Sequence, residues 1–293
     1  MATLSKKIDF AIIISVKNAN PNGDPLDGNR PRTDYDGLGE ITDVCLKRKI
    51  RDRLLENGES IFVQSDDNKT DEFPNLRKRA EASLGNLKNI PDIRNKACAT
   101  WFDVRTFGQV FPFKGSAEKG KKNQNTDTSD DGGSGAGVSI AIRGPVTIQP
   151  AFSLESIRSH IISEQIIKST SLEGDGIKRQ SDQMGMKHRI GKEVIYVTYG
   201  SMNPQLAERT CFSDEDAAVI KEILPKLFEN DASSARPEGS MAVREVIWWE
   251  HKPGKVGQYS SAKVHNSLMV NADGSYSFNK KWDDLKPQEI DGF

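Results

Sequence analysis

The 293-residue sequence predicts an α+β protein with a ferredoxin-like, RRM-type core of βαββαβ order. Three observations support this prediction: apolar runs of strand length, two helical segments with apolar positions at helical spacing, and long polar stretches between these elements. The elements follow one another as β, α, β, β, β, α, β, and one central strand counts as an extension of the core. We expect a single domain over residues 1–293. This superfold is common, so it does not by itself give a function.

The first strand and the first helix have the clearest patterns. Residues 8–17, IDFAIIISVK, form a continuous apolar run that is typical of a strand covered on both faces. A helix is expected over residues 42–57, because Leu46, Ile50 and Leu54 repeat at i,i+4 and share one face. A core strand and an amphipathic helix thus begin the predicted order.

The later elements complete that order. Further strands are expected over residues 97–111, with a turn at Gly108, and over residues 136–152, 194–200 and 241–251. A second helix is expected from the N-cap Ser213, which acidic residues follow, and Pro225 should kink it. The period of two along the last strand places Trp248 and Trp249 on opposite faces of the sheet.

Three polar stretches interrupt these elements. Residues 59–97 are weakly periodic and highly charged, which predicts an insertion. Residues 114–135 contain one alanine and no larger apolar side chain, which predicts a mobile loop. Residues 153–192 mix short apolar runs with polar, glycine-containing segments, which predicts a further projection.

Composition narrows the classes of function. The formal net charge is −1, so any nucleic-acid site must be a local basic face that acids balance elsewhere. Cys45, Cys98 and Cys211 are widely spaced and odd in number, which favours neither a disulfide framework nor a CxxC metal site. No apolar stretch approaches the length of a membrane span. We therefore expect a protein of a reducing cytoplasm without a membrane partner.

The first helix carries a dense group of cations. Its basic residues are Lys47, Arg48, Lys49, Arg51 and Arg53. Cations in the N-terminal half of a helix oppose its dipole, and a bound anion would relieve their repulsion. The pattern therefore indicates phosphate binding. The alternative is a solvated face whose charges pair with the acidic insertions.

The segment NANPNGDPLDGNRPRTDYDG, residues 18–37, joins the first strand to this helix. Arg30 and Arg32 flank Pro31, which stiffens the backbone between two planar donors. The asparagines favour Asx turns, and Gly23 is free to adopt a positive φ. Such turns can form a backbone nest for a phosphate. Taken alone, the segment favours the alternative of a rigid connector.

Two further motifs combine cations with apolar side chains. In FDVRTFG, a strand would place Arg105 and Phe107 on one face, where they could hold a stacked base and its phosphate. The alternative is a core phenylalanine and an ion-paired arginine. In MGMKHRIG, Lys187, His188 and Arg189 lie in the second projection beside methionines that suit wedging against bases. The alternative there is an ordinary charged hairpin tip.

Catalytic patterns are weak throughout the sequence. The four histidines form no HxH, HExxH or HD motif, and the cysteines lack the context of a nucleophile. The glycine-rich segments do not match a phosphate-binding loop followed by a helix. The sequence therefore predicts no cofactor, no metal site and no catalytic residue.

The combined motifs resemble the Cas-seven backbone family of CRISPR surveillance complexes, known as Cascade. The resemblance rests on NANPNGDP, NRPRTD, ITDVCLKRKIRD, FDVRTFG, RGPVTIQ and MGMKHRIG…YVTYGSMNP, spread over about residues 8–230. Within the family, the match resembles the type I-C branch, also called the Csd-two type.

The resemblance implies a hand-like protein. It has an RRM-type palm, finger-like insertions at residues 59–97 and 112–136, and a thumb-like projection at residues 155–192. Copies of the chain would stack head to tail along a CRISPR guide RNA, grip its backbone whatever its sequence, and present it to target DNA in antiviral defence. The implied protein partners are other copies and the repeat-processing, large and small subunits of Cascade, in a prokaryotic cytoplasm.

The resemblance also assigns roles to residues. Those expected at the guide RNA are Asn18, Asn20, Asn22, Gly23, Arg30, Arg32, Lys47, Arg48, Arg51, Arg105, Phe107, Lys187, His188 and Arg189. We expect no enzymatic activity, because the type I branch recruits a separate helicase-nuclease. The rival hypothesis is a metal-dependent ribonuclease that uses Asp24 or Asp34, as some relatives use a loop aspartate. A third is a protein that assembles through protein contacts alone.

Overall fold

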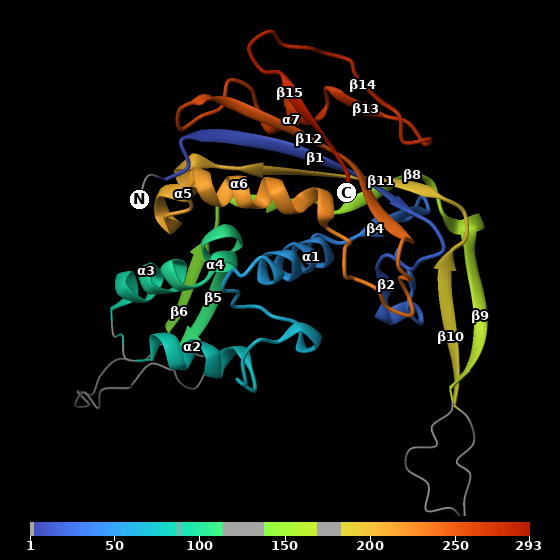
Figure 1. The fold of residues 1–293 in the computed structure, drawn as a ribbon, viewed down its shortest axis with the longest axis horizontal. Helices are drawn as coiled ribbons and strands as arrows, with labels where there is room; N and C mark the ends of the chain where they lie inside the picture. Colours follow the sequence, from blue (N-terminus) through green and yellow to red (C-terminus); the bar gives the residue numbers. More distant parts are fainter. Residues whose placement is uncertain (1–2, 86, 88, 114–137, 169–182) are drawn as a thin grey trace, which may run out of the picture.

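The protein is a mixed α+β fold built on one large antiparallel sheet (Figure 1). The computed structural model describes residues 3–85, 87, 89–113, 138–168 and 183–293. Among them, the main sheet has seven strands in the order β15-β12-β1-β11-β8-β4, and β7 also pairs with β11. These strands are β1 (Lys6–Val16), β4 (Leu38–Ile41), β7 (Val146–Ile148), β8 (Ala151–Ser156), β11 (Val194–Met202), β12 (Met241–Pro253) and β15 (Pro287–Asp291).

Strand β1 lies inside the sheet, between β11 and β12, and both of its faces are covered. The helices α1 (Asp43–Glu56), α5 (Pro204–Thr210) and α6 (Asp214–Ile223) lie on one side of the sheet (Figure 1). The other side carries α7 (Ser261–His265) and the strands β13 (Leu268–Val270) and β14 (Tyr276–Phe278). Ile12 packs in the main core, on the side of α1 and α6, and Ala11 packs in a separate core on the side of α7. The predicted strand with two buried faces is confirmed.

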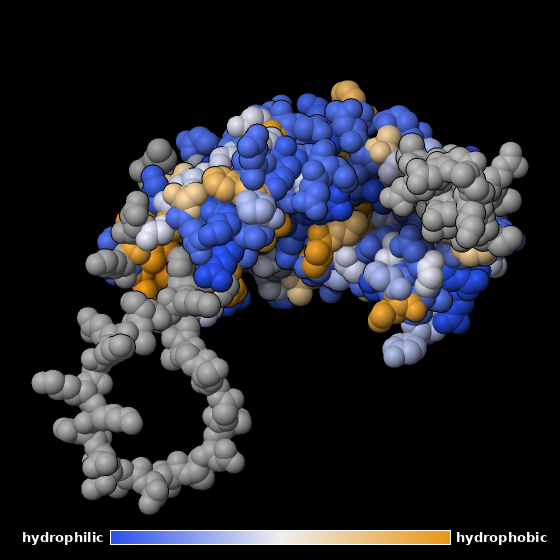
Figure 2. Space-filling view, turned by 90° about the horizontal axis from the view of Figure 1, so that it is seen from below, coloured by the Kyte–Doolittle hydropathy of each residue, from blue (hydrophilic) through white to orange (hydrophobic). Residues whose placement is uncertain are grey.

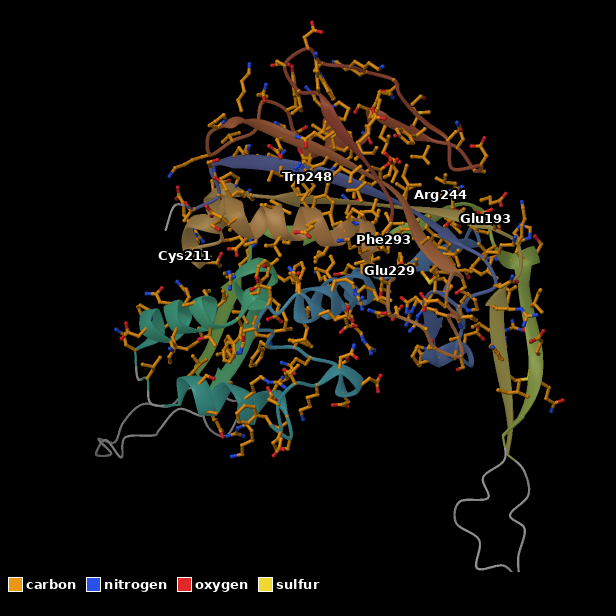
Figure 3. All side chains as sticks on the ribbon, viewed as in Figure 1. Glu193, Cys211, Glu229, Arg244, Trp248 and Phe293 are labelled. Carbon is orange, nitrogen blue, oxygen red and sulfur yellow. The ribbon has the colours of Figure 1, made fainter. Side chains whose placement is uncertain are left out.

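The two tryptophans of β12 show the same two layers. Trp248 stacks on Phe10 with ring centroids 5.7 Å apart, and it points toward α6 (Figure 3). Trp249 meets Phe278 of β14 edge-on, with centroids 6.3 Å apart. Their predicted placement on opposite faces is confirmed.

Side-chain caps start both long helices that pack on the sheet. The Thr42 hydroxyl accepts the N–H of Cys45 at the start of α1. Ser213 and Asp216 form a reciprocal capping box at the start of α6. Pro225 lies in a 3-10 turn (Leu224–Lys226) that directly follows α6, so the predicted kink is the end of the helix. Among the helices that the structure describes, none has the length and apolar character that a membrane crossing needs.

The prediction of a strand over residues 97–111 is wrong for most of its length. The chain there forms the end of α3 (Ile90–Thr100), then α4 (Phe102–Phe107), and only β5 (Gly108–Phe113) is extended. The apolar residues do alternate, but Phe102 packs in the main core and Val104 in a second one. The sequence therefore shows the period of two that is typical of a strand, because apolar residues of this short helix face two different cores.

The second core belongs to a body that hangs from the sheet on the side of α1 (Figure 1). It contains α2 (Leu76–Leu84), α3, α4, β5 and β6 (Val138–Arg143). The rings of Phe62, Trp101 and Phe111 pack together at its centre, with centroids 4.7 to 6.2 Å apart. The charged stretch 59–97 thus contains α2 and most of α3, joined by irregular segments. The segment 114–135, predicted to be mobile, lies outside the described residues.

A second projection extends from the other end of the sheet, again on the side of α1 (Figure 1). It is an antiparallel pair of β9 (Ile161–Lys168) and β10 (Gln183–Ile190). Its base is held by a bridge between Ala19 and Ile190 and by the backbone N–H of Asn18, which donates to Ile190 O at 2.7 Å. The stretch predicted to project therefore contains a β-hairpin anchored to the end of β1.

A buried charge cluster joins β1 to the layer that holds α7. The fully buried Asp9 accepts a hydrogen bond from Nε2 of His251 at 2.8 Å and an ion pair from Lys7 at 3.0 Å. Burial acts to raise the pKa of Asp9, but these partners outweigh it and lower the pKa. His265 lies 3.7 Å from the same carboxylate, and burial lowers the pKa of His265. In the folded protein, Asp9 and His265 therefore both take up a proton only at lower pH than in the unfolded chain.

This cluster predicts a loss of stability in mild acid. Unfolded chain protonates histidine near pH 6.5, whereas folded His265 stays neutral to lower pH, so acid favours the unfolded state by at most about 1.4 kcal/mol per pH unit. We expect the free energy of unfolding to fall more steeply between about pH 7 and 5.5 in the wild type than in His265→Gln, which keeps an N–H for Gly200 O. Urea unfolding at each pH measures the difference, and parallel curves would contradict it.

Candidate functional site

The segment 18–37 is a fixed structure between α1 and the β9–β10 hairpin (Figure 1). Asn18 has a positive φ of 57°, which turns the chain sharply out of β1, and its side chain is exposed. Asn20 is buried, and its backbone N–H donates to Ala235 O at 2.8 Å. Short strands β2 (Gly23–Asp24) and β3 (Arg30–Pro31) then pair with each other. The predicted connector is therefore rigid, and neighbouring segments hold it.

Two of the predicted asparagines bond within the protein. Asn20 donates from Nδ2 to Asn29 O at 2.7 Å. Asn22 accepts from both the N–H and the hydroxyl of Thr42, at 3.0 and 2.9 Å. Because Thr42 is the N-cap of α1, Asn22 ties the loop directly to the start of the basic helix. These two side chains shape the site.

Gly23 is required for space, and it does not use the positive φ that glycine is free to adopt. The positive φ angles in this loop belong to Asn18, Gly28, Asn29 and Gly37. A Cβ on Gly23 would overlap Asn29 Oδ1 and lie 3.0 Å from Asn29 O. The close pairing of β2 with β3 therefore leaves no room for a side chain at Gly23.

Arg30 and Arg32 differ in their freedom. Arg30 is exposed, and no hydrogen bond or ion pair of its side chain occurs within the described part of the chain. Arg32 lies 3.5 Å from the Asp24 carboxylate, and its Nε is buried without a hydrogen-bond partner among the described residues. Arg30 is thus the more available donor of the pair.

The two aspartates of this loop form turns. Asp24 accepts the backbone N–H of Leu26 at 3.1 Å and caps the 3-10 turn Pro25–Asp27. Asp34 accepts the N–H of Leu38 at 2.8 Å and closes the turn before β4. Within the residues that the structure describes, no group of three or more His, Cys, Asp or Glu side chains could hold a metal ion.

Every cation of α1 has a carboxylate partner. The pairs are Lys47–Asp43 at 2.9 Å, Arg48–Asp52 and Arg48–Asp67 at 3.7 Å, Lys49–Asp231, Arg51–Asp103 at 2.9 Å, and Arg53–Glu56 at 2.6 Å. Lys49 and Arg53 are buried, and burial lowers the pKa of Lys49. Arg48 keeps 53% of its side chain exposed, the most of the five. In the absence of a ligand, the cations of α1 are therefore paired with carboxylates, as the alternative interpretation predicted. Arg48 is the most accessible cation of the helix.

Arg105 and Phe107 do not share a site, contrary to the strand-based prediction. Phe107 packs against α1, with the guanidinium of Arg51 5.1 Å and Nζ of Lys47 6.0 Å from its ring centroid. Arg105 instead reaches α6, where Nη2 lies 2.8 Å from Asp216, and it stacks 4.4 Å above Phe102. In helix α4, residues two apart point in different directions, which separates the two side chains.

The three predicted residues of β10 lie near the base of the hairpin. His188 is buried and its Nδ1 lies 2.8 Å from the Ser163 hydroxyl. Arg189 pairs with Glu164 across the hairpin at 2.6 Å. Lys187 is half-buried and has no ion pair among the described residues. Lys187 is therefore the available cation of this group.

A pocket beside α1 was not predicted from the sequence. It has a volume of about 450 Å³, and Arg48 and Arg51 form one wall while Val63, Gln64 and Asp67 line the other. The signal was present in SDDN, an acidic run that follows a strongly basic helix, but nothing in the sequence fixed its distance from the helix. Seen from below, the face with both projections is largely hydrophilic, with smaller separate hydrophobic areas (Figure 2).

Comparison with known proteins gives one consistent family. The model of the family "CRISPR-associated protein Cas7" matches residues 6–291. A protein of that name from Haloferax volcanii is 26% identical over 281 residues, which cover 94% of this chain and 78% of the relative. Two solved chains of CRISPR RNA-guided surveillance complexes are also similar. One, in a pre-nicking state, has a TM-score of 0.43, 11% identity and coverage of 83% and 78% of the two chains. The other has a TM-score of 0.42, 15% identity and coverage of 92% and 77%.

The contact at Gly23 predicts a steric defect that can be rescued. Gly23→Ala should lower the free energy of unfolding by about 1–2 kcal/mol, because the new methyl group overlaps Asn29. Removing that side chain with Asn29→Gly, which suits the φ of 63°, should recover most of the loss. Gly28→Asn is the control, since its φ is 56° and its surroundings are open. Denaturant unfolding of the four proteins checks this, and a harmless Gly23→Ala would refute it.

The pair of Arg105 with Asp216 predicts a structural role for this arginine. Both side chains are largely buried, so Arg105→Ala should lower the free energy of unfolding by about 2–3 kcal/mol. The exposed helix pair Arg77–Glu81 provides the control, and Arg77→Ala should change stability little. Thermal and urea unfolding measure both variants. Equal stability of Arg105→Ala and the wild type would return Arg105 to the candidate ligand-binding residues.

Proposed function

Because this chain belongs to the CRISPR-associated Cas7 family, we propose that it is a backbone subunit of a CRISPR RNA-guided surveillance complex. The family match over residues 6–291 carries the proposal. In this role several copies stack along one guide RNA, hold its backbone and leave its base edges free to pair with target DNA. The other partners are the repeat-processing, large and small subunits of Cascade, and the quoted motifs favour the type I-C branch.

The topology supports an RRM-type palm in this proposal. The elements β1–α1–β8 and β11–α6–β12 form two βαβ units whose strands interleave as β12-β1-β11-β8. Both helices lie on one side of the sheet, where the two projections also lie. We assign the helical body of α2–α4 to the fingers and the β9–β10 hairpin to the thumb.

The environment of each predicted residue divides the guide-binding set. The proposed contact group consists of the exposed Asn18, Arg30 and Arg48 and the half-buried Lys47 and Lys187. Arg51 and Phe107 adjoin this group, and Arg32 lies beside Asp24. Asn20, Asn22, Gly23, His188 and Arg189 position the elements that carry it. Arg105 is assigned to structure.

The proposed subunit has no catalytic role. The carboxylates of Asp24 and Asp34 each accept a hydrogen bond from a backbone N–H, so both residues are explained as turn formers. The rival ribonuclease predicts cleavage of RNA with Mg²⁺ or Mn²⁺ that Asp24→Ala or Asp34→Ala abolishes. Assembly through protein contacts alone predicts filaments that survive nuclease treatment. The proposed role instead predicts co-purification with RNA of defined length and loss of filaments when that RNA is digested.

Backbone grip predicts a characteristic salt dependence. Arg30→Ala and Arg48→Ala should each weaken single-stranded RNA binding several-fold and by a similar factor for unrelated sequences. Each lost phosphate contact should reduce the slope of log K against log salt by roughly 0.7. The control is Lys281→Ala, an exposed lysine next to Trp282, which packs in the core on the side of α7. Fluorescence anisotropy over a salt series measures the slopes, and a defect confined to particular sequences would contradict the proposal.

A further inference from the structure

Arg48 in the pocket beside α1 has two carboxylates nearby that balance its charge, but its N–H donors are free among the described residues. Nε of Arg48 lies 3.7 Å from Asp52 and its Nη2 lies 3.7 Å from Asp67. Both distances are too long for a hydrogen bond. Arg48 makes no hydrogen bond within the described part of the chain, so its guanidinium N–H groups remain available to a closer acceptor.

The second arginine of the pocket is held in place and only partly used. Arg51 donates from Nε to Asp103 at 2.9 Å. Asp103 is buried and also accepts the backbone N–H groups of Phe62 and Val63, at 2.7 and 3.1 Å. These bonds fix Arg51 against the segment that lines the opposite wall. Its two terminal nitrogens are left for a ligand.

The two acids beside Arg48 have different environments. Asp52 is buried on α1, receives the Ser65 hydroxyl at 3.5 Å, and burial raises its pKa. Asp67 lies on the 3-10 turn Asp66–Asn68, and 88% of its side chain is exposed. An exposed ion pair of this length is weak and easily exchanged. Asp52 therefore belongs to the framework, whereas Asp67 can leave Arg48.

We propose that Asp67 acts in the free protein as an internal competitor for the RNA phosphate that the proposed function places at Arg48 and Arg51. A phosphodiester has two non-bridging oxygens, which can bond the free nitrogens of Arg48 and Arg51 together. The Asp67 carboxylate offers the same charge at a longer distance, so RNA replaces it while weaker anions do not. The walls contributed by Val63 and Gln64 leave room for the sugar next to that phosphate. The inference rests on the proposed function.

A charge-matched comparison tests the competitor. Asp67→Asn should tighten binding of single-stranded RNA about threefold at low salt, and the gain should vanish at high salt. Asp283→Asn is the control, because it removes one exposed acid beside Trp282, in the layer that holds α7, and changes the net charge equally. Anisotropy titrations of mixed-sequence RNA measure both. Equal gains from the two variants would overturn the inference.

A double-mutant cycle locates the effect. In Arg48→Ala, which empties the site of its main cation, Asp67→Asn should give no more than the gain of Asp283→Asn. A full threefold gain in that background would show that Asp67 acts elsewhere and would overturn the inference.

A second probe separates this inference from the proposed function. Inorganic tripolyphosphate, titrated by calorimetry, should bind Asp67→Asn about threefold more tightly than Asp283→Asn, without any need for filament assembly. If Asp67→Asn binds tripolyphosphate more tightly than Asp283→Asn but the wild type does not bind RNA, the proposed function is wrong and the anion site stands. RNA binding that is indifferent to Asp67, with no difference for tripolyphosphate, would sink the anion site and keep the function.

Discussion

The burial of β1 on both faces is the constraint on which the rest of the molecule depends. A strand with two covered faces must have its backbone bonds met by β11 and β12, and it can meet solvent only at its ends. The chain leaves at Val16 and turns at once, through the positive φ of Asn18. There Lys17, Asn18 and Asn20 donate backbone N–H groups to Ser240, Ile190 and Ala235. The end of the central strand thus fixes the basic loop and the base of the hairpin together.

Burial also decides which cations are available for binding. A near-neutral chain with 41 basic and 42 acidic residues can pair most of its charges internally, and α1 does so completely. Lys49 and Arg105 lie against partly buried carboxylates, and removing either partner would leave a poorly solvated charge. Arg48 is exposed and loses little when it changes partner, and the exposed Arg30 has no ion pair to lose within the described part of the chain. In the proposed anion binding, a cation would exchange its carboxylate partner for a phosphate, at small cost only where the cation is exposed.

The sequence predicted the elements whose patterns are set locally. The apolar run of β1, the i,i+4 face of α1, the cap at Ser213 and the opposed tryptophans depend on one segment each, and all are found. The region around α4 was misread because Phe102 and Val104 serve two different cores, which no local period reveals. The second core itself unites residues from 62 to 142, across a long polar stretch. The carboxylate partners of some cations cannot be read from a local pattern. Asp216, the partner of Arg105, lies over a hundred positions away, and the two meet only in the finished topology.

The rigidity of the loop 18–37 suits the sequence-independent binding that we propose. Phosphates of any RNA repeat at similar spacing, so a backbone grip gains most when its donors are held at fixed positions. Asn22 links the loop to Thr42 at the N-terminus of α1, and Arg30 is itself a residue of the β2–β3 pair, which packs tightly at Gly23. Arg30 is thereby held in a fixed relation to the cations of α1, although the two lie on different elements. The asparagines and the glycine that looked like a mere connector supply geometry, and the arginines can then supply charge at little entropic cost.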